Sequence, residues 1–339
     1  MRAVMCLNNL TPSGGIRFDL TVMSVLKDLG FKVRILYRGG DPKELLGKYM
    51  PPMSVRPEDF ERTVIPSCYD HTRGRFIPGF PRELEEKINE ADLLVLSTDE
   101  ILIFKEYKVP ILYVTHFPTL APPKTPGPII CNSYYTRRHI YYCWGREWFM
   151  AADVVYPPLP SELYHYHREW YRRKIDVIFY ERLVSYKTKG FYEYKRLLLR
   201  AKPDVNIKVM GVNWDNSVKP DYESPDFKTV LEVLVNSKVY IKFYDKEHFG
   251  IASAEAMASG CIPVLPKGDY GTLEILPFEA RRRLTYVDIP HAVEKTLEIL
   301  RDIKGYDALK KKIGKHVKEV LDMERAKEKI KCILETLPF

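Results

Sequence analysis

Long apolar runs and paired cysteines are both missing from this sequence of 339 residues. No apolar run approaches the roughly 18 residues that a membrane-spanning helix needs, and the first residues lack the apolar core of a secretion signal. The cysteines are scattered and never form a C-x-x-C pair, so we expect buried, reduced thiols at Cys6, Cys68, Cys131, Cys143, Cys261 and Cys332. These absences predict a cytoplasmic protein.

Acidic residues are fewer than basic ones: 45 Asp and Glu stand against 53 Lys and Arg, which gives a formal net charge of +8. A basic protein favours anionic partners, which include nucleotides, anionic lipid headgroups and nucleic acid. Charge alone does not choose among these partners. The chain is also too long for one hydrophobic core, so two domains are expected.

Short apolar runs alternate with segments of helical period, a pattern that builds parallel sheets from strand-helix-strand units. In the first half, the expected strands are residues 2–9, 31–38, 92–97, 110–117, 127–133 and 153–158. After an irregular stretch the pattern restarts, with expected strands at 174–183, 206–212, 238–244 and 261–266. We therefore expect an α/β protein with two Rossmann-like, doubly wound parallel-sheet domains that face each other across a substrate cleft.

The expected division is an N-terminal domain at residues 1–160, a linker at 161–174, a C-terminal domain at 175–320 and a final helix at 321–339 that can pack back on the first domain. The linker is placed where prolines stop a strand and aromatic and basic residues follow with little hydrophobic periodicity. Its part from Tyr164 to Lys174 also has the composition of a membrane-interface segment. Contact with a lipid headgroup is therefore an alternative to a packed linker.

The most informative segment is EHFGIASAEAMASGCIPV, residues 247–264, which is expected to form a loop, a helix and a strand. If the helix begins near Gly250, its free N–H groups and positive dipole end suit a phosphate or a sugar oxygen. Glu247 and Glu255 can then both reach one bound molecule, because carboxylates accept hydrogen bonds from paired sugar hydroxyls. The alternative is that Glu247 only caps the helix dipole and Glu255 is solvated.

This segment resembles the signature of the retaining glycosyltransferases of family GT4, in which two glutamates separated by seven residues precede A-M-A-x-G and P-V. Other segments agree in order. Residues 181–190 (ERLVSYKTKG) resemble the family's G-R-L and K-G segment, residues 207–212 a strand ending in glycine, and residues 268–276 a glycine-rich turn leading to glutamate. The resemblance covers about Ile178 to Leu276 and implies the two-domain GT-B fold.

The resemblance also implies roles for single residues. Arg182 and Lys189 would clamp the diphosphate of the donor, Glu247 would face the transferred sugar, and Glu255 would hold the ribose hydroxyls. A guanidinium, an ammonium and a helix N-terminus together stabilise the charge that develops on a departing nucleoside diphosphate. Further expected donor contacts are Gly211, Phe249, Gly250 and Ile251. Glu181 stands where the family usually has glycine, so we expect its side chain to point away from the diphosphate.

In the first half, Gly14 and Gly15 follow the first expected strand and open a helix, so the backbone there can approach a phosphate or a sugar. A plain tight turn is the alternative, and GT4 proteins carry a similar Gly-Gly. His116 ends a buried strand and is expected to emerge at the cleft, although a lone histidine is more often structural. In the family the matching histidine contacts the donor sugar or the acceptor and is followed by aspartate, whereas Phe117 stands here.

We therefore expect a retaining hexosyltransferase with His116, Arg182, Lys189 and Glu247 as catalytic residues and a UDP- or GDP-sugar as donor. The acceptor is expected to be a sugar, a lipid-linked group or a protein-linked group. No cofactor is expected, and the absence of an Asp-x-Asp pair predicts no metal. Peripheral membrane contact stays open, and nucleic acid is not an expected partner. The alternatives are a sugar-nucleotide epimerase of GT-B fold and a degenerate, non-catalytic binding protein of that fold.

Overall fold

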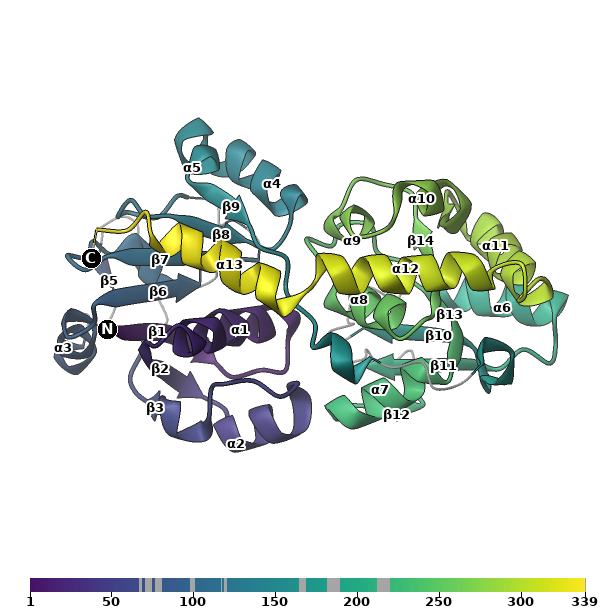
Figure 1. Ribbon diagram of the computed structural model, residues 1–339, viewed down its shortest axis with the longest axis horizontal. Helices are drawn as coiled ribbons and strands as arrows, with labels where there is room; N and C mark the ends of the chain where they lie inside the picture. Colours follow the sequence, from purple (N-terminus) through teal and green to yellow (C-terminus); the bar gives the residue numbers. More distant parts are fainter. Residues whose placement is uncertain are drawn as a thin grey trace. The chain divides into compact units, whose positions relative to one another are not determined.

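The computed structural model describes residues 1–66, 69–70, 75–76, 81–97, 101–116, 118, 121–164, 169–181, 190–211 and 220–338. The chain divides into two compact units. One is formed by Met1–Pro158 together with Met323–Phe339, and the other by Leu159–Asp322. Each unit has its own parallel sheet with helices packed on it, as Figure 1 shows.

The first unit contains, among the described residues, a seven-stranded sheet in the order β3-β2-β1-β6-β7-β8-β9. All of its neighbouring strands are parallel. The strands are β1 (Arg2–Asn9), β2 (Lys32–Gly39), β3 (Phe60–Arg62), β6 (Leu93–Ser97), β7 (Ile111–Thr115), β8 (Ile129–Cys131) and β9 (Ala152–Val154), with a separate hairpin of β4 (Tyr69–Asp70) and β5 (Arg75–Phe76). The helices are α1 (Gly14–Asp28), α2 (Pro42–Glu44), α3 (Arg82–Asn89), α4 (Tyr134–Trp144), α5 (Arg146–Met150) and α13 (Met323–Leu334).

The sheet of the first unit is buried on both faces, because alternate residues of each strand point to opposite sides. From β1, Met5 and Leu7 join one core together with α1 and α13, while Val4 and Cys6 join a second core together with α3 and α4. The C-terminal helix α13 contributes Ala326, Ile330, Ile333 and Leu334 to the first of these cores. Helix α13, drawn in yellow in Figure 1, is thus part of the first unit although it comes last in the sequence.

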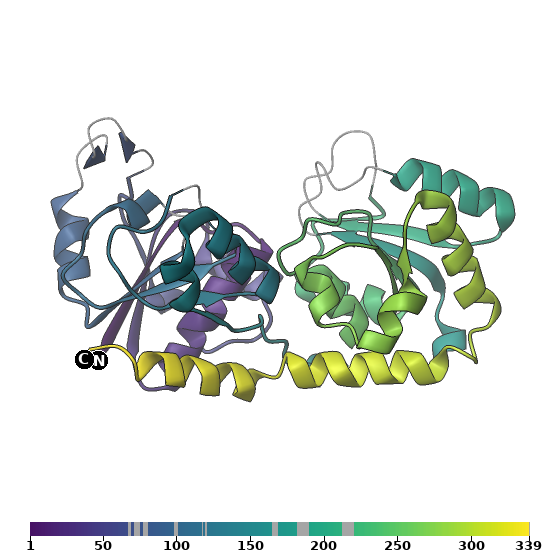
Figure 2. The same ribbon diagram turned by 90° about the horizontal axis from the view of Figure 1, so that it is seen from above.

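The second unit contains, in its described part, a six-stranded parallel sheet in the order β12-β11-β10-β13-β14-β15. The strands are β10 (Ile175–Glu181), β11 (Ile207–Gly211), β12 (Tyr222–Glu223), β13 (Ser237–Ile241), β14 (Ile262–Pro266) and β15 (Thr285–Tyr286). The helices are α6 (Phe191–Ala201), α7 (Phe227–Val235), α8 (Ile251–Ala258), α9 (Gly271–Glu274), α10 (Phe278–Leu284), α11 (Ile289–Arg301) and α12 (Asp307–Val320). Figure 2 shows helices on both sides of this sheet, with α12 in yellow along one of them.

The expected linker belongs to the second unit, and two of its described side chains are buried there. Trp170 is buried and its indole N–H donates to the carbonyl of Lys238 at 3.1 Å. Arg173 is also buried and donates to the carbonyls of Ser237, Ser259 and Gly260 at 2.6, 2.9 and 3.0 Å. Two of the side chains that suggested a membrane interface are therefore enclosed by protein.

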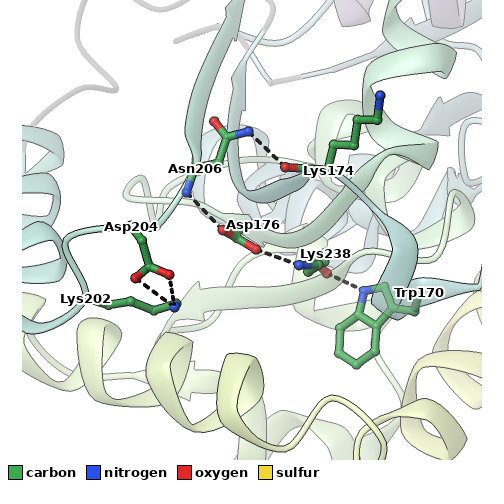
Figure 3. A network of polar contacts seen from close by, with 7 residues as sticks. All are labelled: Trp170, Lys174, Asp176, Lys202, Asp204, Asn206 and Lys238. Carbon is green, nitrogen blue, oxygen red and sulfur yellow. Dashed lines mark hydrogen bonds and ion pairs between the residues drawn. The ribbon is translucent and has the colours of Figure 1, made fainter.

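A polar network ties together the amino ends of the strands of the second unit (Figure 3). Asp176 on β10 accepts from the ammonium of Lys238 on β13 at 2.7 Å and from the backbone N–H of Asn206 at 2.9 Å. Asn206 in turn donates from its amide to the carbonyl of Lys174 at 2.9 Å. These contacts lie at the edge of the sheet opposite the carboxyl ends of the strands.

The prediction of buried thiols holds for some cysteines and is wrong for others. Cys6, Cys131 and Cys261 are buried, whereas Cys143 and Cys332 are exposed because each lies on the outer face of a surface helix. Cys68 lies outside the described residues. Within the described part of the chain, no helix combines the length and apolar character needed to cross a membrane.

Candidate functional site

The carboxyl ends of the strands in the second unit gather the residues that the sequence singled out. Glu181 is the last residue of β10, and Lys242 directly follows the neighbouring strand β13. The loop after Lys242 leads through Glu247 to Gly250, where α8 begins. Because parallel strands end at the same edge of a sheet, these groups lie side by side at the position where doubly wound folds bind ligands.

Gly250 caps the N-terminus of α8 and has a φ of +87°. A Cβ atom at Gly250 would lie 2.4 Å from Oγ1 of Thr272 and 3.1 Å from Cγ of Glu247. Thr272 fixes this loop, since its hydroxyl donates to the carbonyl of Phe249 at 2.7 Å. The sequence therefore needs glycine here for two reasons: the left-handed backbone and the close approach of its neighbours.

A second glycine holds the loop from the other side. A Cβ atom at Gly271 would lie only 1.7 Å from the carbonyl oxygen of His248, and the N–H of Gly271 donates to the carbonyl of Glu247 at 3.1 Å. The glycine-rich turn at residues 268–274 thus packs directly on the loop from Glu247 to Gly250. This contact holds the loop that leads into the N-terminus of α8.

Glu247 lies in this loop with 21% of its side chain exposed, and its carboxylate is 3.2 Å from the ammonium of Lys242. Lys242 is fully buried and makes a closer contact, 2.7 Å, with the carboxylate of Glu181, which is 3% exposed. Burial lowers the pKa of Lys242, but the two carboxylates raise it by more, so the net pKa lies above the ordinary lysine value. Lys242 is therefore a protonated ammonium held between two carboxylates.

Glu255 lies one and a half turns into α8 and is fully buried. Its two carboxylate oxygens accept hydrogen bonds from the hydroxyl of Tyr164 at 3.1 Å and from the hydroxyl of Tyr180 at 2.9 Å. The alternative of a solvated Glu255 is wrong, because tyrosines from two other segments close over it. A ligand hydroxyl that reaches this buried carboxylate either displaces a tyrosine hydroxyl or adds a second hydrogen bond to one of its oxygens.

The other predicted donor contacts occupy different places. Gly211 ends β11 and pairs in register with Glu181. Phe249 and Ile251 are buried on either side of Gly250. Arg182 and Lys189, the predicted diphosphate ligands, lie outside the described residues.

In the first unit, the predicted glycines and the predicted histidine lie together. Ser13 caps α1 by accepting from the N–H of Ile16 at 3.2 Å, so Gly14 and Gly15 form the first turn of that helix. A Cβ atom at Gly15 would lie 3.1 Å from Cδ2 of His116, which shows that the imidazole ring packs against this turn. His116 follows β7 at the carboxyl edge of the sheet, with 12% of its side chain exposed.

His116 has a carboxylate partner that the sequence did not reveal. Its Nε2 lies 3.1 Å from Oδ1 of Asp19, which is buried on α1. The ring also meets Phe18 edge to face, with 5.8 Å between the ring centroids. A carboxylate beside one ring nitrogen fixes the orientation of an imidazole and, in its neutral form, favours the tautomer in which the other nitrogen is an acceptor.

Sequence reasoning missed Lys242, Asp19, Tyr164 and Tyr180 as members of these sites. A signal was present for two of them. Lys242 interrupts the apolar run of residues 239–243, and Asp19 interrupts the apolar stripe of residues 16–26. A charged residue inside an otherwise apolar pattern indicates a buried ion pair, because an unpaired charge there would be strongly destabilising. Tyr164 and Tyr180 gave no comparable signal.

Comparison with known proteins finds similarity in structure but not in sequence. No protein-family model and no curated protein matches the chain. HepE of Anabaena in complex with UDP-glucose is 14% identical, with a TM-score of 0.73 over 99% of this chain and 100% of that chain. A glycosyltransferase from Rickettsia africae is 13% identical, with a TM-score of 0.68 over 99% of both chains. Sucrose-phosphate synthase from Thermosynechococcus elongatus is 11% identical, with a TM-score of 0.68 over 99% of this chain and 98% of that chain.

These matches span essentially the whole chain, so they include both sheets and the C-terminal helix. At such low identity they establish the fold and leave the substrate open. The predicted architecture of two Rossmann-like parallel-sheet units is confirmed. The chain has the two-domain GT-B fold.

Proposed function

We propose that the chain is a retaining glycosyltransferase that transfers a hexose from a UDP- or GDP-sugar, without a metal, to a sugar, a lipid-linked group or a protein-linked group. The donor is assigned to the second unit and the acceptor to the first. The observation that carries the proposal is the juxtaposition of Glu247, Gly250 and the N-terminus of α8 at the carboxyl edge of the second sheet. This arrangement offers a carboxylate for sugar hydroxyls beside a helix end suited to a phosphate.

The hydrogen bonds of Glu255 support the assignment of the nucleoside. Two hydroxyl groups, 2.9 and 3.1 Å away, already occupy its two oxygens. The vicinal 2′- and 3′-hydroxyls of a ribose offer the same pair of donors, so a ribose can replace Tyr164, Tyr180 or both without leaving the buried carboxylate unsatisfied. In this proposal Glu255 selects a ribonucleotide, and Glu247 faces the sugar that is transferred.

The transfer step needs stabilisation of the leaving diphosphate more than it needs a nucleophile from the protein. Arg182, Lys189 and the N-terminus of α8 are proposed to share the developing negative charge. The acceptor hydroxyl attacks the anomeric carbon on the face that the diphosphate leaves, and a departing phosphate oxygen accepts its proton, so the configuration is retained. His116, oriented by Asp19, is proposed to contact the transferred sugar or the acceptor.

The similar structures support the donor class. HepE was crystallised with UDP and with UDP-glucose, and an alpha-glucosyltransferase that is 13% identical, with a TM-score of 0.61 over 98% of this chain and 99% of that chain, was crystallised with UDP and DNA. The names of these proteins point to different acceptors on one scaffold. Our proposal is therefore specific about the donor, a nucleotide sugar, and leaves the acceptor broad.

Thermal unfolding with a panel of UDP-glucose, GDP-mannose, ADP-glucose and the three free diphosphates tests this function. A ligand present at 100 times its dissociation constant should add about 2.7 kcal/mol to the stability. The shift should disappear in Glu255→Ala and persist in Glu232→Ala, a control on the exposed face of α7. Absence of any shift in the unmodified protein would refute a nucleotide-sugar enzyme. Isomerised nucleotide sugar formed without an acceptor would instead indicate an epimerase.

A further inference from the structure

A cluster of three charged side chains contains the proposed sugar contact Glu247 together with the buried Glu181 and Lys242. Lys242 joins the two carboxylates, at 2.7 Å from Glu181 and 3.2 Å from Glu247. Exposure of the side chains rises along this series from 0% for Lys242 and 3% for Glu181 to 21% for Glu247. Glu247 is therefore the member that a ligand can reach, and the other two lie behind it.

The fold holds the backbone of Lys242 in a fixed place. The backbone N–H of Lys242 donates to the carbonyl of Val264 on β14 at 3.1 Å, and its carbonyl accepts from the hydroxyl of Tyr286 on β15 at 2.6 Å. Glu181 is fixed as the last residue of the neighbouring strand β10. Glu247, in contrast, belongs to a loop, so its carboxylate is the group whose position depends on the lysine.

The charges explain why a carboxylate is tolerated at the end of β10. An ionised Glu181 buried without a partner would be strongly unfavourable and would repel both Glu247 and a diphosphate bound nearby. Lys242 neutralises Glu181 through the shorter contact and still reaches Glu247. Glu181 and Lys242 thus form a buried ion pair in which each charge offsets the cost of burying the other.

We propose that Lys242 is a positioning residue of the donor site, which holds the carboxylate of Glu247 against the transferred sugar and removes the charge of Glu181 from the diphosphate. This inference rests on the proposed function. It goes further in one respect: it assigns Lys242 to recognition of the sugar and not of the nucleoside, because Lys242 contacts Glu247, whereas the carboxylate of Glu255 accepts hydrogen bonds from two tyrosines. The measurable consequence is a preference for the nucleotide sugar over the free nucleoside diphosphate.

The experiment compares the affinities of one nucleotide sugar and its free diphosphate, for example UDP-glucose and UDP, by calorimetry on four forms of the full chain. The forms are unmodified protein, Lys242→Met, Lys242→Met with Glu181→Gln, and Lys238→Met. Lys238 is the matched control, because it makes a 2.7 Å ion pair with Asp176 (Figure 3) at the amino end of β13, the strand that Lys242 follows at its carboxyl end. The nucleotide sugar and diphosphate used are those that stabilise the unmodified protein in the thermal-unfolding experiment.

Lys242→Met should lower the ratio of the affinity for the nucleotide sugar to that for the diphosphate by about tenfold, since a hydrogen bond to a charged group is lost from the sugar contact. Adding Glu181→Gln should raise the melting temperature again, because the uncompensated buried carboxylate is gone, while the ratio stays low. Lys238→Met should lower the melting temperature and leave the ratio unchanged. If Lys242→Met alone does not fold, the double variant carries the test of the ratio.

An unchanged ratio in the double variant would overturn the positioning role. An equal fall of the ratio in Lys238→Met would overturn it as well, because the effect would then be general destabilisation. If the unmodified protein binds none of the nucleotides, the proposed function fails and this inference fails with it. Binding of nucleotide sugar by the unmodified protein, with no dependence on Lys242, would refute the inference and leave the proposed function standing.

Discussion

Replacing Gly250 by alanine is expected to damage both the stability of the second unit and its proposed donor site. The φ of +87° costs a residue with a Cβ atom about 1–2 kcal/mol. The new atom would also lie 2.4 Å from Oγ1 of Thr272, so Thr272 has to move, which costs about 1–3 kcal/mol in a packed site. Moving it breaks the hydrogen bond to the carbonyl of Phe249, worth about 0.5–1.5 kcal/mol. We therefore expect Gly250→Ala to lose about 2.5–6.5 kcal/mol.

Denaturant unfolding followed by circular dichroism measures this loss, and Gly30→Ala separates its parts. Gly30 has a φ of +93°, but a Cβ atom there would have nothing within 4 Å, so only the backbone cost of about 1–2 kcal/mol applies. The double variant Gly250→Ala with Thr272→Ala should regain part of the stability, because it removes the atom that clashes. Equal losses for Gly250→Ala and Gly30→Ala would refute the argument from close approach. Nucleotide binding should fall only in the variants at Gly250.

Three further outcomes are expected. Tyr164→Phe should raise the affinity for the nucleotide, since the free protein then lacks one of the hydroxyls that compete with the ribose for Glu255. An unchanged or lower affinity by calorimetry would speak against the replacement of a tyrosine hydroxyl by a ribose hydroxyl. Asp19→Asn should lower turnover, measured as release of nucleoside diphosphate, without changing nucleotide affinity, because Asp19 acts on His116; a matching fall in affinity would contradict this. In the native protein, mass mapping after brief alkylation should find Cys143 and Cys332 modified before Cys261, because burial raises the pKa of the Cys261 thiol to about 11.

The fold could be predicted from the sequence because its long strands are buried on both faces. Residues 92–97 and 261–266 are nearly continuous apolar runs, which is typical of central strands in a parallel sheet, and they form β6 and β14. The short edge strands β3, β12 and β15 contain two or three residues each and were not predicted. A strand of that length is defined by its neighbour in the sheet and leaves no periodic pattern in the sequence.

The site could be predicted only as far as its residues lie close together in the sequence. Glu247, Gly250 and Glu255 fall within one loop and one helix, so their spacing alone brought them to one place. Lys242 and Glu181 are 61 residues apart, and His116 and Asp19 are 97 residues apart. Contacts of this kind follow from strand order, which the alternation of strands and helices does not fix. The exposure of Glu255 was also open, because the tyrosines that cover it come from distant segments.

The two departures from the GT4 pattern bear on whether the site is degenerate. Phe117 stands where the family has an aspartate beside the histidine, yet Asp19 from α1 brings a carboxylate to 3.1 Å from His116. Glu181 stands where the family has a glycine, yet Lys242 neutralises it at 2.7 Å. A protein that has lost its function has no physical need to keep these buried charge pairs. Apolar residues of similar size in the same places would leave the protein no less stable. These two buried charge pairs are consistent with the proposed transferase, and a hydrolysis or transfer assay that detects turnover with any nucleotide sugar distinguishes it from a non-catalytic relative.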